Sequence, residues 1–342
     1  MNQPIMQVKN LVKHFPVMRR GVVLSKQVGT VHACDGVSFD IQRGETLGLV
    51  GESGCGKTTT AQAMLYLIEP DGGEVVFEGK NVYEKFICNN REGILEFRRK
   101  MQLVFQNPYQ SLNPRWTVAD IITEPFRIHR HIPKEEWRDR LYRMLNLVGL
   151  EDYHAERYPH EFSGGQRQRI CIARALAVEP MFLVADEPVS SLDVSVRAQI
   201  LNLLKELQRT LGLTYLYISH DLSSVKHVSH RVGVMYLGKI VELGEADEVF
   251  ESPLHPYTRA LMSAIPIPDP DAQRKRNFLP GEVPSPIDPP PGCRFHPRCE
   301  YASQICKEKE TELHDVGRGH YVACHKTEGV LKLSNNPPTV LP

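Results

Sequence analysis

Residues 51–58 carry the clearest chemistry in this sequence, because they match the phosphate-binding pattern G-x-x-x-x-G-K-[ST]. An apolar run at 46–50 precedes the pattern and a helix-forming stretch at 59–67 follows it. Glycines let the backbone wrap a polyphosphate with its N–H groups turned inward, and a helix N-terminus adds partial positive charge. Lys57 can then reach the β- and γ-phosphates of a nucleotide, and the Thr58 hydroxyl can complete a Mg²⁺ shell. The structural alternative is a glycine-rich turn with no ligand.

Two adjacent acids, Asp186 and Glu187, follow the apolar run 182–185. Asp186 can hold Mg²⁺ directly or through water, and Glu187 can polarise the water that attacks a phosphate. Paired acids at a strand end also serve as helix caps, so it is their position downstream of the glycine-rich turn that favours a catalytic interpretation.

A predicted helix that runs to about residue 177 begins at Ser163-Gly164-Gly165-Gln166. Serine is a good N-cap, so the simplest interpretation is a capped helix. Arg167 and Arg169 lie in its first turns, where the helix dipole normally favours acids. This departure from a local rule suggests an anionic partner at that helix end.

Hydrophobic periodicity predicts the elements that position these residues. A helical pattern extends from about 117 to 178, with Gly149 ending one helix, and a further helix covers 194–211. Residues 17–30 are predicted to form a loop, and 80–97 are polar and irregular. The predicted strands are 5–8, 31–34, 37–41, 46–50, 74–78, 101–105, 181–185, 214–218, 232–236 and 239–242.

The composition excludes several classes of function. The chain has 342 residues with 41 basic and 41 acidic side chains, so no net charge attracts nucleic acid or anionic lipid. It contains no run of 18 apolar residues and no apolar segment of the signal-peptide type, which predicts a cytosolic protein without disulfides. Twelve of its 25 prolines lie between Pro253 and Pro297, which predicts an extended segment there.

The motifs together resemble the ATP-binding subunits of ABC transporters over residues 5 to about 250. They match the Walker A, Q-loop, signature, Walker B, D-loop and switch-histidine motifs of that family at residues 51–58, Gln106, Ser163–Gln166, Asp186-Glu187, Ser191-Leu192-Asp193 and His220. One departure is Phe162, where the commonest family form has leucine before the signature serine. The exchange keeps an apolar side chain.

The resemblance implies an α/β fold: a P-loop ABC-type nucleotide-binding domain with an antiparallel β subdomain and an α-helical subdomain, plus a small Pro/Cys-rich C-terminal extension. The implied domain covers residues 1–251, with its helical subdomain at about 98–178. The extension covers 252–330, and 331–342 are expected to be a disordered tail.

The resemblance also implies which residues act on ATP. ATP would be bound by Phe15 (stacked on adenine), Gly51, Glu52, Ser53, Gly54, Cys55, Gly56, Lys57, Thr58, Thr59, Gln106, Asp186 and His220. In a head-to-tail dimer, the partner's ATP would meet Ser163, Gly164, Gly165, Gln166 and Asp193. Thr58, Gln106 and Asp186 would hold Mg²⁺, and the catalytic residues would be Glu187, His220, Gln106 and Lys57.

Four further stretches resemble the dipeptide and oligopeptide importer branch, namely residues 105–114, 158–162, 255–261 and 284–293. In that branch two different ATP-binding subunits pair at the cytoplasmic face of the membrane. They drive two permease subunits and act indirectly with an extracytoplasmic substrate-binding protein; nucleic acid is not a partner. The alternatives are another cargo (nickel, glutathione or an oligosaccharide), a soluble ABC ATPase that acts on nucleic acid or ribosomes, and a pseudo-ATPase.

Four cysteines gather near the C-terminus, at Cys293, Cys299, Cys306 and Cys324. Clustered thiols in a reducing compartment suggest a metal. The spacing lacks the C-x₂₋₄-C pairs of structural zinc sites, while an all-thiolate site can hold an iron–sulfur cluster. The family resemblance points to a [4Fe–4S] cluster, and zinc or no metal remain the alternatives.

Overall fold

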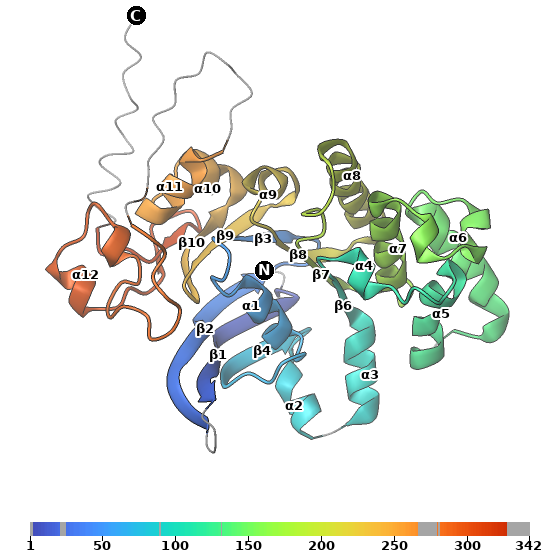
Figure 1. The fold of residues 1–342 in the computed structure, drawn as a ribbon, viewed down its shortest axis with the longest axis horizontal. Coiled ribbons are helices and arrows are strands. Elements are labelled where there is room, and N and C mark those ends of the chain that lie inside the picture. The colour runs from blue at the N-terminus through green and yellow to red at the C-terminus, as the bar shows by residue number, and fades with distance from the viewer. Residues whose placement is uncertain are drawn as a thin grey trace, which may run out of the picture. The chain divides into compact units, whose positions relative to one another are not determined.

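The computed structural model describes residues 3–20, 25–88, 90–130, 132–265, 279 and 281–326 (Figure 1). The predicted tail at 331–342 therefore lies outside the described residues. The chain packs into two units. Unit 1 consists of Met1–Met6, Asp40–Thr46 and Val76–Ser219, and unit 2 of Gln7–Phe39, Leu47–Val75 and His220–Pro342. The boundaries predicted at 251 and 330 remain a prediction.

Three parallel strands form the centre of unit 1, in the order β8 (Thr214–Ile218), β7 (Phe182–Asp186) and β6 (Met101–Val104). Every residue of β7 and β8 is buried, which confirms the interpretation of their continuous apolar runs. In the β6–β7 register Val104 pairs with Ala185, so the residues that follow the two strands leave the sheet at the same edge.

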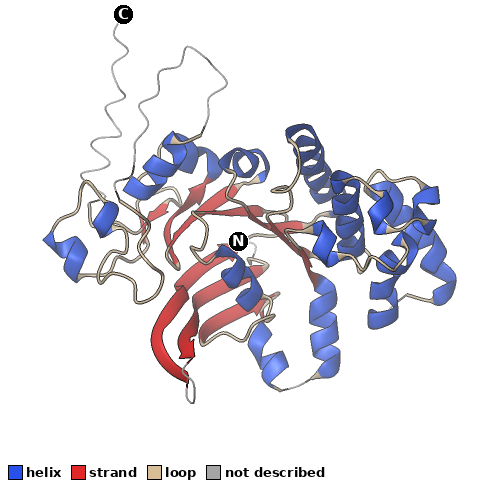
Figure 2. Ribbon diagram, in the orientation of Figure 1, coloured by secondary structure: helices blue, strands red, loops and turns tan. Residues whose placement is uncertain are grey.

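Helices make up most of the rest of unit 1 (Figure 2). The helical pattern predicted for 117–178 is confirmed: α5, α6 and α7 pack on one another, and Gly149 follows α6 with a φ of 69°. The helices of unit 1 are α2 (Val82–Ile87), α3 (Arg91–Lys100), α4 (Pro108–Ser111), α5 (Val118–His129), α6 (Trp137–Leu147), α7 (Gly164–Leu176) and α8 (Val194–Leu211), with short 3₁₀ helices η1 (Lys134–Glu136), η2 (Asp152–Glu156) and η3 (Pro159–Glu161), and a two-residue strand β5 (Lys80–Asn81).

The irregular structure predicted for 80–97 is wrong, because α2 and α3 occupy most of that stretch. Two asparagines cap these helices: the side chain of Asn81 accepts a hydrogen bond from the Tyr83 N–H, and that of Asn90 from the Gly93 N–H. Phe86 and Phe97 then meet edge to face, with ring centroids 5.9 Å apart. Two side-chain caps and one aromatic contact thus stabilise helices in a segment whose polar composition predicted irregular structure.

Unit 2 begins with two long strands, β1 (Met6–Arg20) and β2 (Ser25–Ile41), and β1 lies between β2 and β4 (Gly72–Phe77) (Figure 1). The loop predicted for 17–30 is therefore wrong at 17–20 and 25–30, where both strands continue. The prediction underestimated how far β-branched and polar side chains extend a strand ladder.

Five further strands of unit 2 include the strand before the glycine-rich turn. They are hydrogen-bonded in the order β11 (His314–Asp315), β12 (Tyr321–Val322), β10 (Lys239–Glu245), β9 (Arg231–Tyr236) and β3 (Thr46–Val50). The predicted β9–β10 hairpin is confirmed, and its turn residues Leu237 and Gly238 have φ values of 42° and 81°. Helix α1 (Lys57–Met64) begins at the end of the glycine-rich turn.

The proline-rich segment contains regular structure, contrary to the prediction of an extended chain. Helix α11 (Pro256–Ser263) starts with Pro256 in its first turn, where a missing N–H costs nothing. The other helices of unit 2 are α9 (Leu222–Val228), α10 (Ala246–Glu251), η4 (His296–Arg298) and α12 (Gln304–Glu308). In the described part of the chain, no helix combines the length and apolarity needed to cross a bilayer.

A buried carboxylate ties the C-terminal segment to β10. Glu242 is 0% exposed and accepts hydrogen bonds from the backbone N–H groups of Leu254 and His255, each at 2.8 Å. His320 lies 2.8 Å from the same carboxylate through its Nε2. A buried charge with three donors around it is costly to disturb, so this group fixes where the segment after β10 packs.

His255 makes the stability of this region depend on pH. Burial lowers the pKa of His255 to about 4 from 6.5, and its Nδ1 accepts a hydrogen bond from the Tyr257 N–H. The unfolded chain therefore takes up a proton first as the pH falls below 6.5, and about 2 kcal/mol of unfolding free energy should be lost between pH 7 and pH 5. H255N keeps a capping acceptor without a titrating group, so urea denaturation should show a flatter pH dependence. Equal slopes for the two proteins would contradict this.

Candidate functional site

The glycine-rich turn of unit 2 is closed around the side chain of Lys57. This side chain is buried, and its Nζ donates to the carbonyl oxygens of Gly51 at 2.8 Å and Glu52 at 3.0 Å. The Sγ of Cys55 lies 3.6 Å from the same nitrogen. Burial raises the pKa of the Cys55 thiol, so a neutral group faces the ammonium. The ammonium is held inside the turn, where a phosphate wrapped by it would lie.

Two glycines of the turn cannot be replaced without displacing backbone. A Cβ on Gly51 would lie 2.1 Å from the Met235 carbonyl oxygen, and one on Gly56 would lie 1.9 Å from the Ala33 carbonyl oxygen. Gly56 is also the N-cap of α1 with a φ of 107°. The close approach of the neighbouring strands explains why the pattern requires glycine at both positions. Ser53, Gly54, Thr58 and Thr59 complete this stretch, and Thr58 is exposed at the first turn of α1.

In unit 1 the structure brings together two of the predicted catalytic residues. Nε2 of Gln106, which follows β6, donates to Oε2 of Glu187, which follows β7, at 2.7 Å. This orientation leaves the amide oxygen of Gln106 as the atom that can bind a cation. The parallel pairing of β6 with β7 places both residues at the same sheet edge, as expected for the carboxyl ends of parallel strands.

Asp186 and Glu187 are neighbours in sequence but differ in environment. Asp186 is the last residue of β7 and is 9% exposed. Glu187 has a φ of 47°, which is unusual for a residue with a side chain, and its N–H donates to the Ile218 carbonyl at 2.8 Å. Left-handed backbone at a non-glycine residue often marks a functional site, and here it turns Glu187 out of the strand.

The predicted helix N-terminus at Ser163 is confirmed as a capping box. The Ser163 hydroxyl accepts from the Gln166 N–H at 3.3 Å, and the Gln166 side chain accepts from the Ser163 N–H at 3.0 Å. The anionic partner inferred from the two arginines remains a prediction. Arg167 donates to the Pro159 carbonyl at 2.6 Å, and Arg169 donates to the carbonyl of Val148. Both therefore have structural partners.

Gly165 allows α7 and α8 to approach each other closely. A Cβ on Gly165 would lie 2.3 Å from Cγ1 of Val196. Asp193 caps α8, because its Oδ1 accepts from the Val196 N–H and the Ser195 hydroxyl, each at 2.9 Å. These hydrogen bonds lower the pKa of Asp193. The D-loop aspartate and the signature glycines thus lie at one helix–helix contact.

Phe15 and His220 belong to unit 2. Phe15 lies in β1 with its ring 38% exposed, and the Lys13 Nζ is 5.4 Å from the ring centroid. An exposed ring is able to stack on a ligand. His220 is an exposed residue between β8 and α9, and Asp221 caps α9.

The four C-terminal cysteines lie in one neighbourhood. Burial, together with smaller effects of the thiols of Cys324, Cys293 and Cys306, raises the pKa of Cys299 to about 11. The backbone N–H of Cys293 donates to the Cys306 carbonyl at 2.8 Å. Within the described residues, no three of these sulfurs lie within 4.8 Å of one another. Sulfurs around one zinc ion would lie about 3.8 Å apart, given tetrahedral geometry and Zn–S bonds of about 2.3 Å.

Sequence reasoning missed contacts that link the C-terminal segment to the glycine-rich turn. Arg298 pairs with the Glu52 carboxylate at 3.0 Å, and the Tyr257 hydroxyl accepts from the Glu52 N–H at 2.9 Å. Arg294 pairs with Asp35. The only available signal was that Arg294 and Arg298 adjoin clustered cysteines, which does not predict their partners.

His14, His32 and Asp35 form the single trio of possible metal ligands found within 4.8 Å among the described residues. The Asp35 carboxylate already meets both imidazoles, at 3.3 and 3.2 Å, and the guanidinium of Arg294. Burial opposes the charged form of Asp35, but Arg294, the His32 imidazole and Lys239 together lower its pKa. Its charge is thus balanced by neighbours, and the trio is a hydrogen-bonded network.

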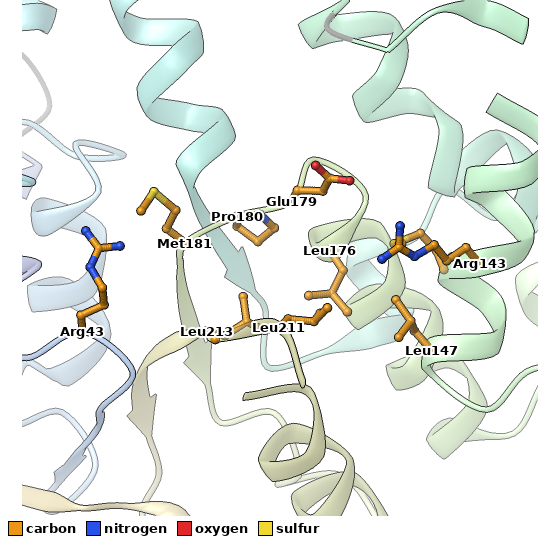
Figure 3. Close-up of a pocket in the computed structure, with 11 residues that line it drawn as sticks. Arg43, Arg143, Leu147, Leu176, Glu179, Pro180, Met181, Leu211 and Leu213 are labelled. Carbon is orange, nitrogen blue, oxygen red and sulfur yellow. The ribbon is translucent and has the colours of Figure 1, made fainter. Parts of the chain in front are cut away.

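A pocket of about 480 Å³ lies elsewhere in unit 1, between the ends of α6, α7 and α8 (Figure 3). Leu176, Leu211 and Leu213 line it, with Arg43 and Arg143 on either side. Met181 and Leu213 directly precede β7 and β8, so the pocket lies at the amino ends of these strands. Asp186 and Glu187 lie at the opposite, carboxyl end, where ligands of parallel sheets bind.

Comparison with known proteins gives consistent matches. A family model described as "ABC transporter" matches residues 34–190, and one described as "Oligopeptide/dipeptide transporter, C-terminal region" matches 241–306. The oligopeptide transport ATP-binding protein OppF of Bacillus subtilis (strain 168) is 52% identical over 330 residues, which are 96% of this chain and 98% of that protein. The dipeptide transport ATP-binding protein DppF of Escherichia coli (strain K12) is 48% identical over 324 residues, 95% of each chain.

A solved structure shares the fold. The dimeric ATP-binding cassette MJ0796, in a post-hydrolysis state bound to ADP and Pi, aligns with a TM-score of 0.61 and 28% identity. The alignment covers 70% of this chain and 98% of that one.

Replacing Gly165 by alanine should destabilise unit 1. The new methyl would overlap Val196, and overpacking of this kind typically costs about 1–3 kcal/mol. G164A is the matched control, because its nearest neighbour is the Leu192 Cδ2 at 3.3 Å, the end of a flexible side chain. Urea denaturation should show a loss for G165A that V196A partly restores. Equal stability of G165A and G164A would contradict the close helix contact.

Proposed function

The chain belongs to the oligopeptide and dipeptide transport ATP-binding proteins of the ABC transporter family, and we propose that it hydrolyses ATP to energise an importer of di- or oligopeptides. The observation that carries the proposal is the 2.7 Å contact between Gln106 and Glu187 at the carboxyl edge of the β6–β7 pair. It places a candidate base beside a candidate water- and metal-binding amide, which phosphoryl transfer to water requires.

Each predicted site residue has a role in this proposal. Glu187 accepts the proton of the attacking water, and Gln106 orients that water and the carboxylate. Lys57 exchanges its carbonyl partners for phosphate oxygens, and the turn Gly51–Thr58 with Thr59 binds the phosphates through backbone N–H groups. Phe15 stacks on adenine, and His220 hydrogen-bonds the γ-phosphate.

Thr58, Gln106 and Asp186 offer a hydroxyl, an amide oxygen and a carboxylate, which are the hard oxygen ligands that Mg²⁺ prefers. The donor set therefore fits this ion. When bound, Mg²⁺ supplies charge neutralisation on the β- and γ-phosphates.

We infer that the chain works in a head-to-tail pair with a second, homologous ATP-binding subunit. The capped N-terminus of α7 presents Ser163, Gly164 and Gly165 without any acidic side chain in its first turn, which suits an anion supplied by a partner. Gln166 completes the cap, and Asp193 lies at the same helix contact. The solved relative MJ0796 is dimeric and holds ADP and Pi, which supports a paired arrangement.

We also infer two permease partners and, through them, a substrate-binding protein outside the cell. Such a chain would lie at the cytoplasmic face of the membrane, attached through the permeases. The names of OppF and DppF support peptide as cargo. Nickel, glutathione or an oligosaccharide are the alternative cargoes, and action on nucleic acid is disfavoured by the equal numbers of acidic and basic residues.

For the C-terminal extension we propose a [4Fe–4S] cluster held by Cys293, Cys299, Cys306 and Cys324. Four thiols that influence one another's pKa fit an all-thiolate ligand set. Among the described residues no three of their sulfurs lie within 4.8 Å of one another, whereas one zinc ion would require sulfurs about 3.8 Å apart. When bound, the cluster supplies a cross-link for a segment too small to fold around a core of its own.

Substitution E187Q tests the ATPase proposal. The amide cannot accept the proton of water, so phosphate release should fall at least about a hundredfold while ATP still binds. Uptake of a labelled peptide by cells that carry E187Q in place of the wild-type chain should be lost as well. E161Q, at an exposed glutamate of η3, is the control. Normal turnover in E187Q would refute the role of Glu187. If cells that carry E187Q take up peptide normally but no longer take up nickel or glutathione, the proposed peptide cargo is wrong and the lost compound is the cargo.

Anaerobic purification tests the cysteine cluster. The protein should contain about four iron and four sulfide ions per chain and absorb at about 400 nm. C299S should lose the absorbance, whereas C88S should keep it, because Cys88 is an exposed cysteine of unit 1. One zinc per chain without visible absorbance, or no metal at all, would overturn the assignment.

A further inference from the structure

Glu52, the second residue of the glycine-rich turn, is held from outside the turn. Its carboxylate faces Arg298, with one contact at 3.0 Å and two at 3.4 Å that involve both terminal nitrogens of the guanidinium. Paired contacts of this kind fix direction as well as distance. Arg298 has 8% of its side chain exposed and Glu52 has 30%, so water screens the guanidinium side of this ion pair little.

A second contact fixes the backbone of the same residue. The Glu52 N–H donates to the Tyr257 hydroxyl at 2.9 Å, and Tyr257 is a fully buried residue of α11. The Glu52 carbonyl in turn accepts from the Lys57 Nζ at 3.0 Å. Every polar group of Glu52 is thus engaged, and the residue connects the C-terminal segment with the lysine of the turn.

The other end of the turn is supported in a similar way. Arg294, with 6% of its side chain exposed, donates to the Leu237 carbonyl and pairs with Asp35. The next residue, Gly238, donates its N–H to the Cys55 carbonyl at 2.8 Å. Arg294 and Arg298 lie on one short stretch around η4, so a single piece of the C-terminal segment contacts the supports of both ends of the turn.

We propose that Arg298 and Tyr257 are positioning residues that set the affinity of the glycine-rich turn for ATP. Neither touches the position of the phosphates; they hold Glu52, and through its carbonyl they fix the starting position of Lys57. The C-terminal extension thus contributes to the nucleotide site, because its residues position Glu52 and, through Glu52, Lys57. The proposal rests on the proposed function, because it requires that the turn binds ATP.

A merely structural ion pair would change stability without changing nucleotide affinity, so the test measures both. The full chain is titrated with ATP and Mg²⁺ by calorimetry, and thermal unfolding is recorded without nucleotide. R298Q should raise the Kd for ATP about tenfold, and Y257F should raise it by a smaller factor. R298K should bind ATP more tightly than R298Q but less tightly than the wild type. The lysine ammonium keeps the positive charge opposite Glu52 but lacks the directed contacts of the guanidinium.

A double-mutant cycle keeps the test usable if one charge left alone destabilises the protein. E52Q/R298Q removes both charges. If the two residues act through one contact, the Kd of the double variant should equal the higher of the Kd values of E52Q and R298Q, because the two losses of ATP affinity do not add. R318Q is the matched control, since Arg318 is an 89% exposed arginine of the same extension. Its Kd should stay within about twofold of the wild type.

Variant K57A separates a failure of the ATP site from a failure of the positioning role of Arg298 and Tyr257. K57A should abolish ATP binding; if it does not, the nucleotide site itself is misplaced. If K57A abolishes binding while R298Q and Y257F leave the Kd unchanged, the positioning role is overturned and the ATPase proposal stands. Lowered melting temperatures with unchanged Kd would likewise reduce Arg298 to a structural residue.

Discussion

The phosphate-binding turn is organised around one buried ammonium group. Lys57 is 6% exposed, and an ion so far from water needs acceptors close by. The chain supplies them from its own backbone, at Gly51 and Glu52. This requires the turn to close on itself against β9 and β2, and the close approach leaves no space for a Cβ at Gly51 or Gly56. The glycine pattern is thus a consequence of where the lysine must lie.

Contiguous features of the site were predictable, and long-range ones were not. The turn at 51–58, the cap at Ser163 and the acids after β7 are each specified by neighbouring residues. The Gln106–Glu187 contact also depends on how β6 and β7 pair. The two apolar runs and the family resemblance suggest that these strands pair, but they do not give the register. The Arg298–Glu52 pair spans 246 positions, and no local pattern of an arginine identifies such a partner.

The incorrect predictions share a cause. Residues 80–97 were interpreted from their polarity, yet Asn81 and Asn90 begin helices whose few aromatic residues suffice to pack. Residues 17–20 and 25–30 were interpreted as a loop, yet they continue β1 and β2. In both cases the average composition of a short segment was outweighed by contacts that only tertiary structure supplies.

Adjacent acids at the end of β7 acquire different properties through backbone geometry. Along a strand, successive side chains point to opposite faces, so a second acid in regular geometry would turn away from the first. The left-handed conformation of Glu187 breaks this alternation, and the hydrogen bond to the Ile218 carbonyl holds it there. Asp186 therefore stays buried, while Glu187 meets Gln106 at the sheet edge. One strained residue thus separates the two acids to which the proposed mechanism gives different roles, Asp186 as metal ligand and Glu187 as base.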